Sequence, residues 1–183
     1  MTAADTSAVL VRRAVLDDCP SINSIYNFYV RTSPATFDTV EMPLPRRHEW
    51  LEAHAAADLP VFVAELDGQL AGWCSLSAWS PKRAYDTTVE ESIYIADSFR
   101  GRGLGRLLLA AALGAARDRG THVVMAGIVA CQEPSLALHR KLGFEQTGLN
   151  PHMGFKLGQW HDVASFQRAL WCSPDLPVAT HSR

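Results

Sequence analysis

Apolar residues recur at helical spacing in four segments of the chain. In the first segment, Ile22, Ile25 and Tyr29 lie about one turn apart and would share one face of a helix capped by one of two preceding aspartates. The last two segments stop at Gly120 and Gly143, where a left-handed cap is expected. The predicted helices span residues 17–29, 45–59, 103–119 and 134–142.

Between these helices the apolar residues alternate or form short runs, as they do in strands. Asp67-Gly68 separates two such runs and is typical of a two-residue hairpin. The order of elements in the middle of the chain favours one α/β domain over residues 8–172, with flexible ends at 1–7 and 173–183. The predicted strands span residues 8–13, 61–65, 69–77, 88–96, 123–129, 144–149 and 163–170.

Length and composition limit what this domain can be. The chain has 183 residues, of which 48% are hydrophobic, which is enough for one core and too little for two ordinary domains. A formal net charge of -2 argues against a nucleic-acid binder. With no signal-peptide pattern and no apolar stretch of membrane-spanning length, we expect a soluble, cytoplasmic protein without membrane partners.

The cysteines give no sign of a metal site or a disulfide framework. They lie at positions 19, 74, 131 and 172 and form no C-x-x-C pair. We therefore interpret them as free thiols and expect no metal.

A glycine-rich run follows the predicted strand 88–96 and opens the next helix. Residues Arg100 to Gly105 read R-G-R-G-L-G. The glycines let the backbone approach a ligand closely, and the unpaired N–H groups of the first helical turn attract an anion. Arg100, Arg102 and Arg106 either add positive charge to that site or point into solvent. The run predicts an anion-binding turn that suits a pyrophosphate.

Three interpretations of this run compete when it is taken alone. A dinucleotide-binding fold needs G-x-G-x-x-G near the start of a βαβ unit, whereas the spacing here is G-x-G-x-G in mid-chain, after a hairpin. A P-loop needs G-x-x-x-x-G-K-[ST], which the chain lacks. A glycine-rich turn without a ligand is the third interpretation.

The order of motifs along the chain adds a family resemblance. Residues 100–105 are similar to the R-x-x-G-x-G/A signature of the GNAT superfamily, whose members transfer acyl groups from CoA to amines. The strand T-V-E-E-S-I-Y-I at 88–95 and the helix S-L-A-L-H-R-K-L-G-F at 135–144 resemble motifs of the phosphinothricin and methionine sulfoximine acetyltransferases. With further matches in the amino-terminal helix and in a hairpin at 154–162, the resemblance covers roughly residues 9–172.

The resemblance implies a fold and a cofactor. The fold is the α/β GNAT fold, a mixed central sheet flanked by helices, in which two splayed parallel strands form the acetyl-CoA cleft. Acetyl-CoA would act as co-substrate, and the protein would be a homodimer. Gln132 stands where the family often has asparagine. The residues implied to bind acetyl-CoA are Ile93, Tyr94 and Ile95 at the pantetheine, Arg100, Gly101, Arg102, Gly103, Leu104, Gly105 and Arg106 at the pyrophosphate, and Gln132 and Ser135 at the following helix.

Glu90 is the candidate general base, because a protonated amine must lose a proton before it attacks a thioester. Its neighbour Glu91 faces the other side of the sheet, since adjacent strand residues alternate. The residues alone leave the choice between the two open. The resemblance assigns the base to Glu90 and leaves Glu91 as an exposed strand glutamate. A partly closed cleft would raise the pKa of the base towards neutrality.

His139 is the second catalytic candidate. It stands where many GNAT enzymes have a tyrosine that serves as acid near the CoA sulfur. Three interpretations stay open: the histidine is that acid, it supports the base, or it is an ordinary helix histidine. Lys82, Arg83 and Tyr85 precede the base and either grip the acceptor's anionic groups or form a solvated loop. Phe37 lines the acceptor pocket or belongs to the core.

The sequence therefore predicts an N-acetyltransferase that moves acetyl from acetyl-CoA directly to the α-amine of a small amino acid. Phosphinothricin, methionine sulfoximine and methionine sulfone are the candidate acceptors. A broader amino-acid or amine N-acetyltransferase is the nearest alternative, and the motifs disfavour a protein or histone acetyltransferase. A non-catalytic acyl-CoA sensor would lack proton-handling groups such as Glu90 and His139, which are present.

Overall fold

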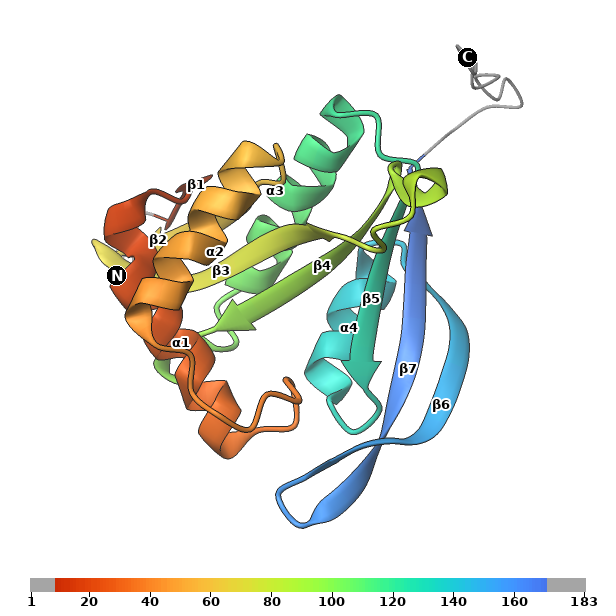
Figure 1. The fold of residues 1–183 in the computed structure, drawn as a ribbon. Helices are drawn as coiled ribbons and strands as arrows, with labels where there is room; N and C mark the ends of the chain where they lie inside the picture. The colour runs from red at the N-terminus through yellow and green to blue at the C-terminus, as the bar shows by residue number, and fades with distance from the viewer. Residues whose placement is uncertain (1–8, 171–183) are drawn as a thin grey trace, which may run out of the picture.

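One mixed sheet organises residues 9–170, the part of the chain that the computed structural model describes. Its strands are β1 (Val9–Arg13), β2 (Val61–Leu66), β3 (Gln69–Ala78), β4 (Thr88–Ile95), β5 (Val123–Val129), β6 (Glu145–Lys156) and β7 (Gln159–Ala169). They lie in the order β1-β2-β3-β4-β5-β7-β6 (Figure 1). The expected flexible ends, 1–7 and 173–183, lie outside the described residues.

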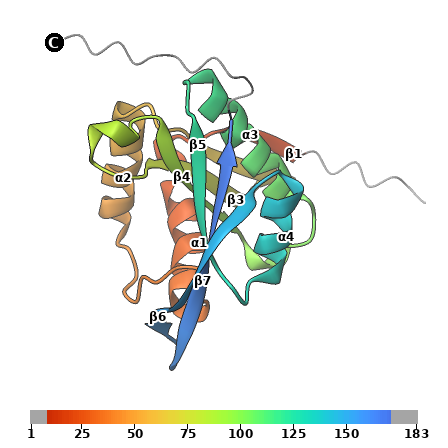
Figure 2. The same cartoon turned by 90° about the vertical axis from the view of Figure 1, so that its right-hand side faces the viewer.

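Helices cover both faces of this sheet, as Figures 1 and 2 show. They are α1 (Cys19–Thr32), α2 (Leu44–Ala56), α3 (Leu104–Asp118) and α4 (Glu133–Lys141). Alternation along β3 divides the core, because Cys74 and Leu76 pack with α3 whereas Trp73 packs with α1 and α2. The predicted α/β architecture is confirmed.

The parallel pair β4 and β5 is short, and this shapes the molecule. The two strands are paired only at Thr88↔Val123, Val89↔Val124 and Glu90↔Met125. Beyond Glu90 they separate, and we call the region in which the two strands diverge the fork (Figure 1). The β4 backbone groups that face β5 beyond the fork have no strand partner there. The predicted pair of splayed parallel strands is therefore present.

The carboxy-terminal hairpin is longer than the sequence pattern predicts. The expected strands, 144–149 and 163–170, are the bases of β6 and β7, which continue to a turn at Leu157-Gly158. Alternation fails as a signal here, because the outer half of the hairpin is largely exposed on both faces. A register irregularity between Asn150 and Gly154 also interrupts the pattern.

Candidate active site

Glu90 lies at the fork, as the last residue of β4 that pairs with β5. Its side chain is half-buried and faces α1 and α2, and a methyl group at Gly127 of β5 would lie 3.7 Å from its Oε1. Burial, followed by the nearby charge of Glu91, raises the pKa of Glu90 above its ordinary value. A carboxylate of this kind is suited to accepting a proton.

Glu91 is buried, and the expectation of an exposed strand glutamate at this position is wrong. The residue is 6% exposed, and its Oε1 lies 2.7 Å from Nε2 of His139 on α4. Its Oε2 lies 3.9 Å from the thiol sulfur of Cys74. The physical reason is that α4 covers this face of β4, and a carboxylate beneath a helix needs a partner. The partner is 48 residues away in sequence, which local patterns do not reveal.

His139 is 1% exposed and both of its ring nitrogens have partners. Nδ1 lies 2.7 Å from the carbonyl oxygen of Ser135, so Nδ1 is the donor in that bond. Nε2 and Glu91 then share one further proton. Burial favours the neutral ring, but the hydrogen bond and charge of Glu91 outweigh it and raise the pKa of His139. The ring lies on the opposite face of the sheet from Glu90, and its roles as acid or as support for the base stay predictions.

The glycine-rich loop follows β4 and opens a helix, as its sequence predicts. Gly101 and Gly103 have φ values of 76° and 79°, in the left-handed region that favours glycine, and α3 begins directly afterwards at Leu104. The N–H groups of Leu104 and Gly105 begin the helix and have no carbonyl one turn earlier within it, whereas the Arg106 N–H already donates to the Gly103 carbonyl at 3.1 Å. At Gly105 a methyl group would lie 3.1 Å from Leu138 of α4, and the role of this glycine in cofactor binding stays a prediction. This glycine lets the two helices pack closely.

The arginines of this loop are exposed and rest against aromatic rings. Arg100 forms an ion pair with Asp97 at 3.0 Å and lies over the ring of Tyr29, with 5.2 Å to its centroid. Arg102 lies over Phe99 at 5.5 Å. These contacts keep two positive charges beside the first turn of α3.

The remaining residues predicted to bind acetyl-CoA lie on the two sides of the fork. Tyr94 is buried among aromatic rings, and the Ile95 carbonyl accepts a hydrogen bond of 2.6 Å from the Tyr29 hydroxyl. Gln132 and Ser135 are half-buried in the first turn of α4, after β5 ends. The fork therefore has unpaired strand backbone on one side and a helix start on the other.

Phe37 lies in the connection between α1 and α2 and packs against β6. Its ring is 38% exposed, and a methyl group at Gly154 would overlap it. Lys156 of β6 is buried and donates hydrogen bonds to the backbone oxygens of Thr36 at 2.6 Å and Tyr29 at 3.3 Å. The hairpin therefore anchors this connection from a position 120 residues away in sequence.

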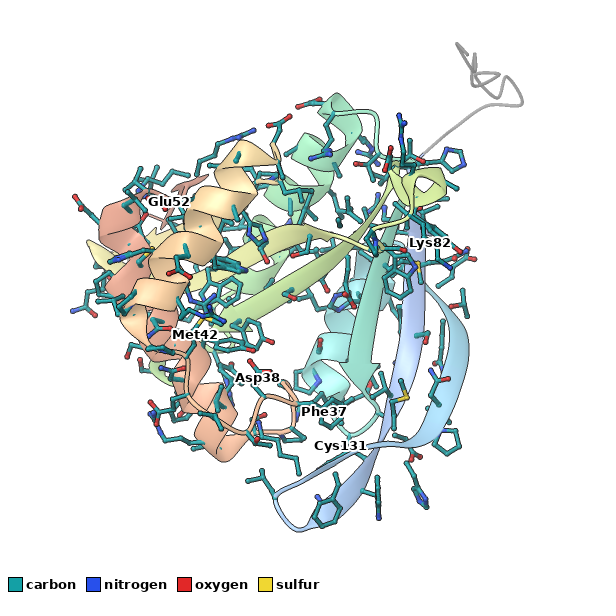
Figure 3. The ribbon with its side chains drawn as sticks, in the orientation of Figure 1. Phe37, Asp38, Met42, Glu52, Lys82 and Cys131 are labelled. Carbon is teal, nitrogen blue, oxygen red and sulfur yellow. The ribbon has the colours of Figure 1, made fainter. Side chains whose placement is uncertain are left out.

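The predicted acceptor contacts come from separate places. Lys82, Arg83 and Tyr85 lie in the exposed loop between β3 and β4. Figure 3 shows Lys82 near the start of β4, whereas Phe37 and Asp38 lie towards the far end of β5. The structure does not bring Lys82 and Phe37 together, and their roles stay predictions.

Two neighbours of Glu90 are absent from the sequence predictions. Ser77 of β3 is the antiparallel partner of Glu90, and its hydroxyl lies 3.1 Å from Nε2 of His54 on α2. The loop between β3 and β4 contains no short turn motif that would fix its length. The sequence therefore does not reveal which residue of β3 pairs with Glu90. His54 lies seven positions after the buried Arg47, a spacing that indicates the inner face of α2.

Within residues 9–170, no group of three or more His, Cys, Asp or Glu side chains is placed to hold a metal ion. No helix in the same range is long and apolar enough to cross a membrane.

Replacing His139 with glutamine should destabilise the protein by about 3–5 kcal/mol at pH 6, because it leaves the Glu91 carboxylate buried without its charged partner. The raised pKa of His139 contributes stability that is fully present below the unfolded pKa and is lost as pH rises through the folded one. The difference between wild type and His139→Gln should therefore shrink between pH 6 and pH 9. Urea unfolding at pH 6 and pH 9 measures this difference in the free energy of unfolding. A difference that does not change with pH would contradict a charged Glu91–His139 pair.

The chain matches known proteins over most of its length. Residues 22–144 match the acetyltransferase (GNAT) family. The chain is 38% identical to an L-methionine sulfoximine/L-methionine sulfone acetyltransferase of Pseudomonas paraeruginosa, over 87% of this chain and 94% of that protein. It is 38% identical to an L-amino acid N-acyltransferase of Escherichia coli, over 87% and 93% of the two chains.

A solved structure agrees with these sequence matches. It is a GNAT superfamily phosphinothricin acetyltransferase from Sinorhizobium meliloti in complex with acetyl-CoA, with a TM-score of 0.86 and 34% identity over 88% of each chain. The unpaired β4 backbone and the left-handed glycines before α3 fit such a donor. The chain therefore belongs to the GNAT acetyltransferase family, whose members use acetyl-CoA as the acyl donor.

Proposed function

We propose that the protein acetylates the α-amine of small amino acids, with methionine sulfoximine, methionine sulfone and phosphinothricin as its favoured acceptors. The observation that carries this proposal is the half-buried Glu90, with its raised pKa, at the fork. The acceptors named for the relatives support the substrate class.

In the proposed reaction, acetyl-CoA supplies an acetyl group activated as a thioester. Glu90 accepts a proton from the acceptor's ammonium group, directly or through water, which frees the nitrogen lone pair for attack. A C–N bond forms and the C–S bond breaks. The ammonium nitrogen loses two protons in all: one ends on the CoA thiol and the other leaves as the net product of the turnover.

The chain's own groups would hold the donor along the fork. The edge of β4 at Ile93–Ile95 that β5 leaves uncovered is available to pair with an amide-containing chain, and the start of α3 is available to an anionic group. In this scheme the Glu91–His139 pair holds α4 against β4. We assign His139 to this role in preference to that of the acid, because its ring is buried and both of its nitrogens have partners.

Phe37 and Asp38 would border the acceptor at one end of the fork. Tyr26 donates a hydrogen bond of 2.6 Å to Asp38, and the buried Lys156 holds the connection that carries both residues. Lys82 and Arg83 are exposed in the loop before β4, apart from Phe37, so their positive charge would attract an anionic acceptor towards the site without contacting it at Phe37.

A broader amino-acid N-acyltransferase is the second candidate, and the relative from Escherichia coli favours it. The two candidates differ in acceptor range and share the same use of Glu90. A non-catalytic acyl-CoA sensor would be stabilised by acetyl-CoA without releasing CoA in the presence of any acceptor.

We further place the protein in the cytoplasm, where acetyl-CoA is available, as a homodimer formed through the β6–β7 hairpin. Phe155 and Trp160 are cross-strand partners on this hairpin and pack edge to face, and more than half of each residue is exposed. Large aromatic residues exposed together are typical of a protein interface.

Glu90→Gln should lower kcat by about 10²-fold or more with methionine sulfone as acceptor and leave acetyl-CoA binding intact, because glutamine keeps the shape but cannot accept the proton. Free CoA, detected with a thiol reagent, measures turnover. In the wild type, kcat/KM should fall on the acidic side of its pH profile with a pKa above the ordinary glutamate value of 4.5, because the pKa of Glu90 is raised. Exposed Glu145→Gln is the control, and full activity of Glu90→Gln would rule out this base.

Gly154→Ala should raise KM for the acceptor severalfold while KM for acetyl-CoA stays unchanged, because the new methyl group displaces the Phe37 ring. Gly148→Ala on the same strand is the matched control, since its methyl group would meet only Ser165 at an ordinary 3.9 Å. Steady-state kinetics with each substrate varied separately measures both constants. Equal effects of the two substitutions on acceptor KM would remove Phe37 from the acceptor site.

Trp160→Ser combined with Phe155→Ser should convert the dimer to a monomer, because the substitutions remove the exposed aromatic pair from the proposed interface. Sedimentation velocity at micromolar concentration measures the mass. A wild-type protein that sediments as a monomer would contradict the proposed assembly.

A further inference from the structure

Tyr29 is a buried residue of α1 that contacts both parts of the predicted donor site. Its hydroxyl donates a hydrogen bond of 2.6 Å to the Ile95 carbonyl oxygen at the end of β4. Its ring lies beneath the guanidinium of Arg100, whose central carbon is 5.2 Å from the ring centroid. The helical spacing of the sequence places Tyr29 on the inner face of α1 and reveals neither contact.

The Ile95 carbonyl belongs to the edge of β4 that faces the fork. In an antiparallel pair, the N–H and carbonyl of one residue face the partner strand, and those of the next residue face away from it. The Ala96 N–H donates to the Ala71 carbonyl of β3 at 2.8 Å, so the backbone groups of even-numbered residues face β3. The backbone groups of Ile93 and Ile95 therefore face the fork, and Tyr29 holds the last carbonyl of this edge.

Arg100 opens the glycine-rich loop, five positions after Ile95. A single turn of 3₁₀ helix, Asp97–Phe99, occupies most of the interval. An ion pair of 3.0 Å with Asp97 also holds the Arg100 guanidinium, which keeps it over the Tyr29 ring. Tyr29 therefore contacts both ends of the segment that joins the edge of β4 to the start of α3.

Tyr29 is itself held firmly. The residue is 7% exposed, and its ring packs edge to face against Tyr94 of β4, with 5.1 Å between the centroids. Its carbonyl oxygen, near the end of α1, accepts a hydrogen bond of 3.3 Å from the buried Lys156 of β6. A side chain fixed by its ring, its hydroxyl and its backbone gives the segment 95–100 a rigid support.

We propose that Tyr29 is a positioning residue that sets the separation between the two parts of the donor site. The inference rests on the proposed function, in which the amide-containing arm of the donor lies along Ile93–Ile95 and its pyrophosphate lies at the start of α3. CoA must fill both parts at once, so its affinity depends on their separation being fixed before it binds. A fragment of CoA that fills one part alone does not depend on that separation.

Tyr29→Phe tests this role, because it removes the bond to Ile95 and keeps an aromatic ring beneath Arg100. In calorimetric titrations the Kd of CoA should rise about tenfold, since the end of the β4 edge is no longer fixed relative to the loop. The Kd of 3′-phospho-ADP, which is CoA without its pantetheine arm, should stay within about twofold of the wild-type value.

Thr32→Val is the matched control. It removes a hydroxyl that is bonded to the Phe28 carbonyl on the same helix, and it should leave both Kd values unchanged. Tyr29→Leu removes the hydroxyl and the ring together. It should raise the Kd of both ligands, because Arg100 then loses its support beside the start of α3.

Wild-type affinity of Tyr29→Phe for CoA would overturn the inference. An equal loss for CoA and 3′-phospho-ADP in Tyr29→Phe would also overturn it, because general destabilisation affects both ligands alike. An unchanged Kd of 3′-phospho-ADP in Tyr29→Leu would contradict the role of the ring. The titrations contain no acceptor and need no turnover. A wild type that releases no CoA with any amino acid would therefore overturn the proposed function without changing their result.

Discussion

The separation of β4 from β5 after Glu90 is the constraint on which the rest of the structure depends. Parallel strands normally satisfy each other's backbone groups, and a strand that loses its neighbour inside a sheet leaves donors and acceptors without partners. The structure keeps β4 in place from its other edge, through its pairing with β3 along the strand. The unpaired edge is thereby rigid as well as free, which is what a site for an extended, amide-containing ligand requires.

Alternation along β4 then gives its two adjacent glutamates different environments. Glu91 lies beneath α4 and needs the charge of His139 to stay buried, so this pair fastens the helix to the strand. Glu90 faces the other way and is half-buried, with no ionic partner among residues 9–170, and its pKa is raised. Glu91 bonds His139 of α4, whereas Ser77, the strand partner of Glu90, bonds His54 of α2. Each histidine bonds the carbonyl four residues earlier through Nδ1. One environment supports a fixed ion pair, and the other supports proton transfer.

Local patterns predicted most helices and strands and the position of the glycine-rich loop, because these depend on neighbouring residues. The hairpin at Asp67-Gly68 and the glycine caps have the predicted conformations. Long-range contacts could not be predicted in the same way. The burial of Glu91 depends on a helix far along the chain, and the anchoring of the Phe37 connection depends on Lys156. The third glycine of the loop, Gly105, also packs closely against Leu138, which only the folded chain reveals.

Hydrogen–deuterium exchange with and without CoA tests the role of the fork most directly. If the donor lies along the unpaired edge, CoA should slow exchange of the amides at Ile93–Ile95 and in the first turn of α3. The amides of β1 and β2, on the far side of the sheet, should exchange at unchanged rates. Protection confined to other parts of the chain, with β4 unchanged, would contradict the account that the fork is the donor site.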